Sequence, residues 1–191
     1  MLDYASRTVQ VRTRRLPHWT ADNGTYFVTF RLADALSKEL ARKIADRKRR
    51  SQPIQSFLDR GDGRCWLRDH RVASMVDRAI RFFDEKRYLL HAWTIMPNHV
   101  HVVLRTCGSF TPRQITHSWK SYTSLEANKI LGRRGWFWQT ESYDVLHDQH
   151  DLDRVIRYIV ANPIKAHLVN WPWTTVLRTG GAGWKPALHE G

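Results

Sequence analysis

Two histidines separated by a single valine are the residues of this chain with the clearest potential for chemistry. His99 and His101 lie in a segment rich in β-branched residues, Trp93–Leu104. If this segment contains a strand, its period of two places both imidazoles on one face and Val100 on the other. Two histidines so placed can chelate one metal ion. If that ion is a hard one such as Mg²⁺ or Mn²⁺, an oxygen ligand would normally be added to the two nitrogens. A pair of hydrogen-bonded sheet histidines would have the same spacing, so the spacing alone leaves both interpretations open.

A tyrosine and an asparagine near the C-terminal end form a second candidate group. Asn162 follows Tyr158 by four residues on a predicted helix, so the phenol and the amide share one helix face. This arrangement would present a nucleophile and a third metal ligand together. Most helix tyrosines simply pack, and Tyr143 is a rival nucleophile in a predicted strand.

The charge of the chain favours a polyanionic partner. Its 191 residues include 31 Lys and Arg against 18 Asp and Glu, a formal net charge of +13, and the sequence pI is about 10.3. Nucleic acid is the first candidate. The basic clusters expected to contact phosphate groups are Arg12, Arg14 and Arg15; Arg47, Lys48, Arg49 and Arg50; and Arg133 and Arg134. Trp136 and Trp138 are candidates for stacking on unpaired bases, although neighbouring tryptophans more often fill a core.

These residues must be positioned by strands and helices, whose expected order along the chain predicts one α+β domain. Its mainly antiparallel sheet would be flanked by helices. We expect strands over 25–32, 88–93 and 98–105 and a short strand within 136–146. Helices are expected over 38–50, 69–86, 112–131 and 151–161, the last stopped or bent at Asn162-Pro163. Residues 1–15 form a basic arm, 16–173 the domain, and 174–191 a flexible tail rich in Gly and Trp.

Neither membrane insertion nor a disulfide framework is expected. No apolar run approaches the roughly 20 residues of a spanning helix, and the N-terminus lacks the layout of a signal peptide. Cys65 and Cys107 have no metal-ligand spacing and are interpreted as ordinary thiols. We therefore expect a cytoplasmic protein.

Three motifs in order resemble a known family. They are Met96-Pro-Asn-His-Val-His101, then Gly135-Trp-Phe-Trp-Gln139 with Tyr143-Asp144, then Arg157-Tyr-Ile-Val-Ala-Asn-Pro-Ile-Lys-Ala166. Together with Tyr26-Phe-Val-Thr-Phe30 they resemble the single-tyrosine HUH transposases, also called IS200-like, and most closely the REP-associated tyrosine transposases. The resemblance covers roughly residues 16 to 173.

The resemblance implies a ferredoxin-like HUH fold and an enzyme that cuts and rejoins single-stranded DNA beside a hairpin. By this likeness His99 and His101 match the paired metal ligands, for Mg²⁺ or Mn²⁺, and Tyr158 matches the nucleophile that becomes joined to the 5′ phosphate. Asn162 matches the polar position that completes the metal site, where the family often has glutamine. A monomer is expected, with a dimer as the alternative, in the bacterial cytoplasm at the nucleoid.

Two other functions compete with strand transfer. One is a non-catalytic hairpin-binding protein with a vestigial metal site, against which the intact His99, His101 and Tyr158 argue. The other is a metal-dependent or histidine-nucleophile phosphohydrolase acting on nucleotides, whose histidine-triad pattern would need a further histidine two residues before or after the pair. Pro97 and Val103 occupy those positions, which disfavours this reading.

Overall fold

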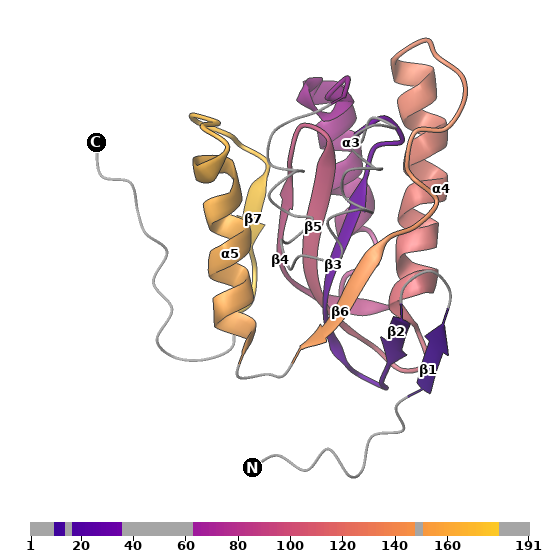
Figure 1. The fold of residues 1–191 in the computed structure, drawn as a ribbon, viewed down its shortest axis with the longest axis vertical. Coiled ribbons are helices and arrows are strands. Elements are labelled where there is room, and N and C mark those ends of the chain that lie inside the picture. Colours follow the sequence, from indigo (N-terminus) through magenta and orange to yellow (C-terminus); the bar gives the residue numbers. More distant parts are fainter. Residues whose placement is uncertain (1–9, 14–16, 36–62, 148–150, 180–191) are drawn as a thin grey trace, which may run out of the picture.

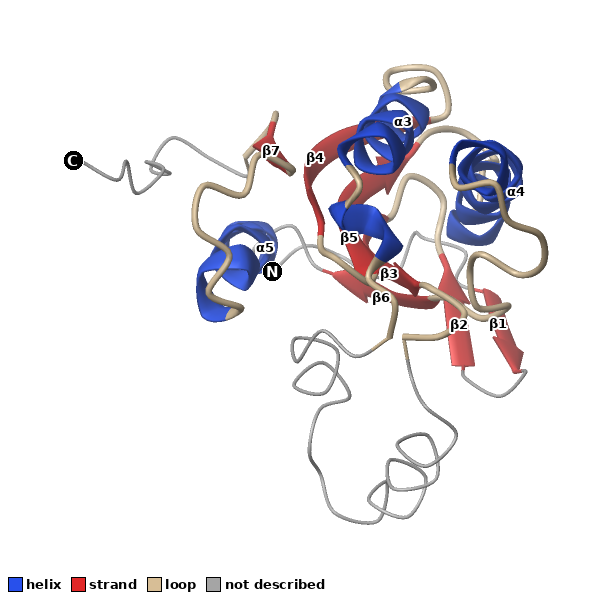
Figure 2. Cartoon of the chain, turned by 90° about the horizontal axis from the view of Figure 1, so that it is seen from above, coloured by secondary structure: helices blue, strands red, loops and turns tan. Residues whose placement is uncertain are grey.

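The computed structural model describes residues 10–13, 17–35, 63–147 and 151–179, and its centre is a five-stranded antiparallel sheet. The strands lie in the order β6-β3-β5-β4-β7 (Figure 1). Their bounds are β3 Thr25–Arg31, β4 Tyr88–Ile95, β5 His99–Thr106, β6 Tyr143–His147 and β7 Thr174–Val176. Helices α3 (His70–Arg81) and α4 (Pro112–Ile130) cover one face, and α5 (Leu152–Lys165) covers the other (Figure 2). The predicted α+β class is therefore confirmed.

The alternating strand pattern divides the core into two layers. Tyr26, Val28 and Phe30 of β3 belong to the cluster that packs against α3 and α4. Phe27 of the same strand packs on the other face against the apolar side of α5, which includes Ile156. The opposite faces of the sheet thus bury different sets of side chains, as a period of two requires.

Local signals explain where two of the helices begin. The Asp69 side chain accepts a hydrogen bond from the backbone N–H of Arg71 and caps α3. Thr111 and Gln114 form a reciprocal capping box at the start of α4.

The helix predicted to run to Lys86 ends earlier, at Arg81. A tight turn follows it, in which Glu85 takes a positive φ of 65° and the Asp84 carboxylate accepts hydrogen bonds from the N–H groups of Glu85 and Leu90. Asp side chains favour such local bonds over helix continuation.

The last helix continues past the proline expected to stop or bend it. α5 reaches Lys165 although Pro163 lies inside it. Pro163 removes one backbone donor. The backbone carbonyls of Asn162 and Pro163 still accept hydrogen bonds. The N–H of Ala166 donates to Asn162 O over 3.0 Å, and the N–H of Leu168 donates to Pro163 O over 2.9 Å.

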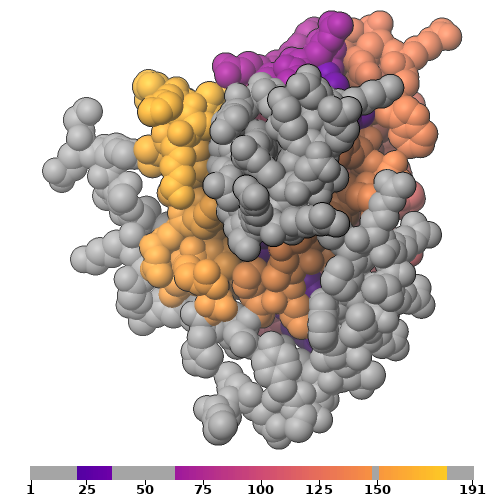
Figure 3. All heavy atoms as spheres, viewed as in Figure 1, coloured from indigo at the N-terminus to yellow at the C-terminus, as the bar shows by residue number. Residues whose placement is uncertain are grey.

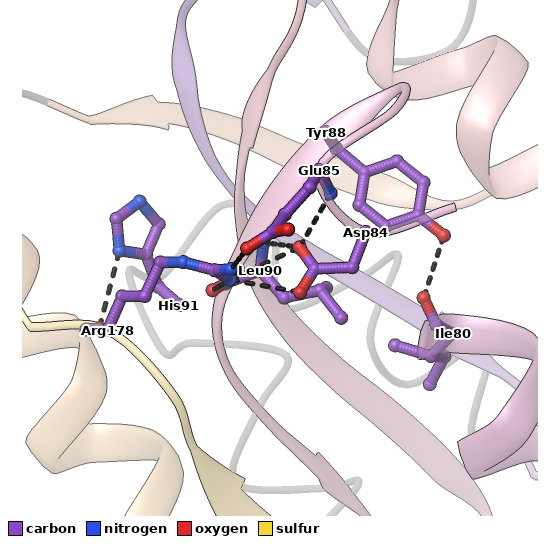
Figure 4. A network of polar contacts seen from close by, with 7 residues as sticks. All are labelled: Ile80, Asp84, Glu85, Tyr88, Leu90, His91 and Arg178. Atoms are coloured by element: carbon purple, nitrogen blue, oxygen red, sulfur yellow. Dashed lines mark hydrogen bonds and ion pairs between the residues drawn. The ribbon is translucent and has the colours of Figure 1, made fainter. Parts of the chain in front are cut away.

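The sheet extends into the segment expected to be a flexible tail. β7 pairs antiparallel with β4, with Trp93 opposite Thr175. Beyond it, Arg178 donates to Asp84, Glu85 and the carbonyl of Leu90 (Figure 4). The boundary expected at residue 174 is therefore too early, because strand pairing and this ion-pair network hold the chain through Arg178.

Two short elements precede the central sheet. β1 (Gln10–Thr13) lies within the expected basic arm of residues 1–15 and pairs antiparallel with β2 (Pro17–Thr20), which follows that arm. Arg12 lies in β1, but its side chain is outside the described structure, as are Arg14 and Arg15. The helix expected over 38–50, with Arg47, Lys48, Arg49 and Arg50, also lies outside the described residues. No helix in the described ranges is long and apolar enough to cross a membrane.

Candidate active site

The two histidines lie side by side at the start of β5, on the face covered by α5. Both are fully buried, and their Nε2 atoms are 3.0 Å apart. Burial lowers the pKa of His99 to about 3, with a further contribution from the charge of Arg31. Burial also lowers the pKa of His101 well below its usual value. Both imidazoles are therefore neutral at pH 7, which is the form that binds metal ions.

The outer nitrogen of each imidazole has a hydrogen-bond partner. His99 Nδ1 lies 2.7 Å from Asn98 Oδ1, and His101 Nδ1 lies 2.7 Å from Thr29 Oγ1. An amide oxygen only accepts, so His99 Nδ1 carries its proton and Nε2 has a free lone pair. In the metal-free protein His101 Nε2 then donates to His99 Nε2, and the Thr29 hydroxyl donates to His101 Nδ1.

This geometry fits the histidines as ligands of one divalent ion. Two nitrogens about 2.1 Å from an octahedral ion and at right angles to each other are about 3.0 Å apart, and the observed separation is 3.0 Å. Binding would need a lone pair on both Nε2 atoms, hence a proton on His101 Nδ1. The Thr29 hydroxyl can accept that proton's hydrogen bond as readily as it donates. Within the described ranges no group of three or more His, Cys, Asp or Glu side chains is arranged to hold a metal.

Helix α5 brings Tyr158 against the histidine pair. Its ring centroid lies 5.9 Å from that of His101 and 5.8 Å from that of Phe27, both in edge-on geometry. Phe27 in turn stacks on His101 at 5.1 Å. The Lys165 ammonium lies 5.3 Å from the centre of the Tyr158 ring, which places a cation beside the phenol.

Asn162 lies one turn after Tyr158 on the same helix. Its Nδ2 donates to the Tyr158 carbonyl over 2.9 Å. Its Oδ1 is buried and has no hydrogen-bond partner among the described residues. An amide oxygen is a suitable ligand for a hard cation. A buried acceptor without a partner is costly, so this atom fits a role as a further oxygen ligand.

The rival tyrosine is farther from the histidines. Tyr143 lies on β6 directly opposite Thr29, and Thr29 lies directly opposite His101. Cross-strand partners share a face, so Tyr143 projects to the same side of the sheet. Two strand spacings of about 4.8 Å separate it from His101, whereas Tyr158 is in ring contact with that histidine.

Three neighbours of the histidines escaped the sequence reasoning: Thr29, Asn98 and Arg31. Arg31 is the cross-strand partner of His99, and its Nε donates to Gln139 Oε1. The alternation of β3 already places Thr29 and Arg31 on one face. The sequence does not tell which strand and which residues they lie opposite. That depends on the register between segments about 70 residues apart.

The two tryptophans that were candidates for stacking on bases differ in their exposure to solvent. Trp138 is only 3% exposed and donates from Nε1 to Thr123 Oγ1 within the core, so it is not available to stack on a base. Trp136 is 78% exposed. It stays a candidate, and Arg133 donates to its carbonyl over 3.1 Å.

Arginines without acidic partners gather around a further aromatic ring near this segment. The guanidinium carbons of Arg64 and Arg133 each lie 5.7 Å from the centre of the Trp66 ring. Neither forms an ion pair within the described part of the chain. Because Leu67 donates to the carbonyl of Pro97, this cluster lies at the end of the sheet where β5 begins with His99.

Comparison with known proteins assigns the family. The family model described as "Transposase IS200 like" matches residues 65–162, about half of the chain. The chain therefore belongs to the IS200-like transposase family, whose members act on DNA, and the resemblance drawn from its motifs is confirmed.

One solved structure shares the fold. A REP-associated tyrosine transposase bound to a REP hairpin has 18% identity and a TM-score of 0.54, with 91% of this chain and 92% of that chain covered. A protein from Deinococcus radiodurans R1, provisionally named a transposase, has 14% identity over 72% of this chain and 89% of that chain. Its TM-score of 0.36 is too low to bear on the fold. No curated protein matches the chain.

Proposed function

We propose that this protein is a single-strand DNA endonuclease and strand transferase that cleaves beside REP-like hairpins through a tyrosine nucleophile. The observation that carries the proposal is the ring contact between Tyr158 and His101, within a buried histidine pair, in a chain of the IS200-like family. The hairpin substrate is suggested by the REP hairpin bound to the transposase of similar fold. We further propose that it acts as a monomer at the bacterial nucleoid.

The reaction is an in-line displacement at phosphorus. The Tyr158 oxygen attacks the scissile phosphate, a P–O bond to tyrosine forms, and the P–O3′ bond breaks. The phenol proton passes to a base or to solvent, and the departing 3′ oxygen takes up a proton. In rejoining, a 3′ hydroxyl attacks the phosphotyrosine, so no external energy source is needed.

His99, His101 and Asn162 would hold Mg²⁺ or Mn²⁺, which supplies Lewis-acid stabilisation of charge on the phosphate. The role of α5 is to hold the phenol beside that site. Lys165 lies 5.3 Å from the ring centre and favours the phenolate electrostatically. The packing of Phe27 against both Tyr158 and His101 fixes their relative position.

The DNA interface that we propose lies at the end of the sheet where β5 begins. Arg64, Arg133 and Arg134 would contact phosphates, and exposed Trp136 would stack on an unpaired base. Stacking on Trp66 uses the π faces of Arg64 and Arg133. The N–H edges of Arg64 are left for phosphate oxygens.

Covalent capture tests the proposal. Hairpin-forming oligonucleotides from the flanking genome, labelled at either end, are incubated with Mn²⁺ and separated under denaturing conditions. A 5′-phosphotyrosine puts the 3′ label on the protein and leaves the 5′ label on a free fragment with a 3′ hydroxyl.

Matched variants assign the nucleophile. Tyr158→Phe abolishes the adduct, whereas Tyr143→Phe and Tyr122→Phe, an exposed position on α4, retain it. An adduct lost only in Tyr143→Phe would transfer the role to that residue. Tight hairpin binding without any adduct would instead indicate a non-catalytic hairpin-binding protein.

A further inference from the structure

Arg31 is a partly buried cation next to the histidine pair. It ends β3 directly opposite His99, on the same face as Thr29, whose hydroxyl contacts His101. Gln139 forms two hydrogen bonds with Arg31. The Oε1 atom of Gln139 accepts from Arg31 Nε, and the backbone N–H of Gln139 donates to the Arg31 carbonyl over 2.9 Å.

Among the described residues Arg31 has no acidic partner, although it is partly buried, whereas two other partly buried or half-exposed arginines are paired. Arg178 pairs with Asp84 and Glu85, and Arg81 pairs with Asp77. No carboxylate in the described ranges forms an ion pair with Arg31, and burial lowers its pKa. Withdrawing a guanidinium from water without a counter-ion is unfavourable. Such an arrangement is expected where an anion arrives from outside the chain.

We propose that Arg31, oriented by Gln139, is an anion-binding residue that contacts a non-bridging oxygen of a DNA phosphodiester at the histidine pair. The identity of the anion as the scissile phosphate rests on the proposed function, whereas the anion site itself does not. Gln139 occupies only Nε, and no other hydrogen bond of the guanidinium is seen among the described residues, so its two terminal nitrogens can bind a phosphate in a forked geometry.

Such a contact strengthens as the reaction proceeds. Negative charge on the phosphoryl oxygens is redistributed in the transition state, and a fixed guanidinium stabilises it without reorganisation. Gln139 acts through Arg31, whose position it sets by two hydrogen bonds, so it is a positioning residue.

The first experiment measures anion binding without DNA. Thermal unfolding of the full-length protein is followed in metal-free buffer while inorganic phosphate is added at constant ionic strength. A ligand that binds only the folded state raises the unfolding midpoint, and at a given concentration a tighter ligand raises it more. The variants are Arg31→Gln and Arg105→Gln. Arg105 lies on the same face of β5, six residues beyond His99, about 20 Å along the strand.

We expect phosphate to stabilise wild type and Arg105→Gln alike, and to leave the midpoint of Arg31→Gln unchanged. Without phosphate, Arg31→Gln should unfold no earlier than wild type, because an unpaired buried charge has been removed. Equal stabilisation of all three proteins, or none in wild type, would overturn the proposal. An unfolding midpoint of Arg31→Gln well below that of wild type, with phosphate dependence intact, would make Arg31 a structural residue.

The second experiment connects the anion site to cleavage. Arg31→Gln should slow adduct formation on the hairpin oligonucleotides by about 10²–10³-fold and weaken hairpin binding far less. Arg31→Lys should recover only part of the rate, because an ammonium lacks the fork. A rate within twofold of wild type in Arg31→Gln would overturn the catalytic assignment. If wild type forms no adduct, the proposed function fails, but the phosphate measurement still decides the anion site.

Discussion

The orientation of two buried imidazoles depends on one hydroxyl and one amide oxygen. Thr29 and Asn98 each lie 2.7 Å from the outer nitrogen of a histidine. Hydrogen bonds of this kind fix the tautomer and ring position of metal-binding histidines. Of the two partners only Thr29 can reverse its role, because a hydroxyl both donates and accepts.

Replacing the Thr29 hydroxyl should weaken metal binding. Thr29→Val leaves His101 Nδ1 buried without a partner, so Mn²⁺ affinity should fall about 10–100-fold, as measured by titration calorimetry. Thr29→Ser keeps the hydroxyl and should bind within a factor of about three of wild type. Equal affinity in Thr29→Val and wild type would show that the hydroxyl does not orient His101.

A second buried histidine makes stability depend on pH. His91 lies in the β4 bulge, its Nδ1 donates to the Arg178 carbonyl over 3.3 Å, and its Nε2 has no partner in the described structure (Figure 4). Burial lowers the pKa of His91, and the charges of Arg178 and Arg105 lower it further, while the hydrogen bond to the Arg178 carbonyl and the charge of Asp84 raise it. Below pH 6.5 the unfolded chain therefore binds a proton that the folded His91 does not, and stability falls as the pH falls.

Urea unfolding at several pH values isolates this contribution. Between pH 6.5 and 5 the free energy of unfolding of wild type should decrease more steeply than that of His91→Gln. The difference should be at most about 1.4 kcal/mol per pH unit, the limit for one proton. His99 and His101 contribute equally to both proteins, so parallel curves would rule out a role for His91.

At the scale of elements, α5 positions Tyr158, the proposed nucleophile, through its apolar face. Ile156 and Ile159 are fully buried against Phe27 and Val103 of the sheet. The helix has no side-chain cap at its N-terminus. Its place therefore depends on packing more than on local signals.

Truncating that face should destabilise the fold. Ile156→Ala should lower the free energy of unfolding in urea by about 2–5 kcal/mol, because it leaves a cavity between α5 and the sheet. The matched control is Ile164→Ala on the same helix, where the side chain is 53% exposed, and its effect should stay within about 0.5 kcal/mol. Similar losses in both variants would mean that α5 is not docked as described.

The C-terminal strand β7 is followed by Arg178, whose ion pairs and hydrogen bonds with Asp84 and Glu85 help to attach it. Arg178→Met removes several charge-assisted hydrogen bonds to Asp84 and Glu85, so unfolding in urea should cost about 2 kcal/mol less. Lys129→Met breaks the more exposed pair with Glu126 and should change stability by at most about 0.5 kcal/mol. If Arg178→Met and Lys129→Met change the free energy of unfolding equally, β7 is attached by strand pairing alone.

At the scale of the whole molecule, the net charge of +13 favours DNA, for which we proposed an interface at the end of the sheet where β5 begins. In the space-filling view, α5 and β7 lie on one side of the visible face and α4 on the other, with β6 between them (Figure 3). Clustered arginines near the C-terminal end of α4 provide a local excess of positive charge there. The affinity for DNA should therefore depend steeply on salt.

Charge and stacking can be separated by the salt dependence of hairpin binding. Arg134→Ala should reduce the slope of log affinity against log salt by about 0.7, the value for one phosphate of a single strand. Trp136→Ala should weaken binding by about 1–3 kcal/mol and leave the slope unchanged. Arg113→Ala, at the opposite end of α4, should alter neither quantity, and anisotropy titrations at several salt concentrations test all three. A reduced slope for Arg113→Ala would indicate nonspecific charge attraction.

Much of the candidate site was predictable because it is encoded by short-range periodicity. A strand through His99 and His101 must place both rings on one face, and a helix through Tyr158 and Asn162 must align the phenol and the amide. The ordered motifs pointed to the family. These relations hold within single elements, so no knowledge of the partner elements is needed.

The tertiary structure decided which of these faces meet and what surrounds them. Strand register placed Thr29 opposite His101 and Arg31 opposite His99, and packing brought α5 onto the histidine face. It also buried Trp138, which a sequence pattern cannot distinguish from exposed Trp136, and added β7 to the sheet. Periodicity within an element is local, whereas register and burial arise from contacts between distant segments. The amino-acid sequence by itself therefore determined the candidate reactive groups, and only the fold decided their partners.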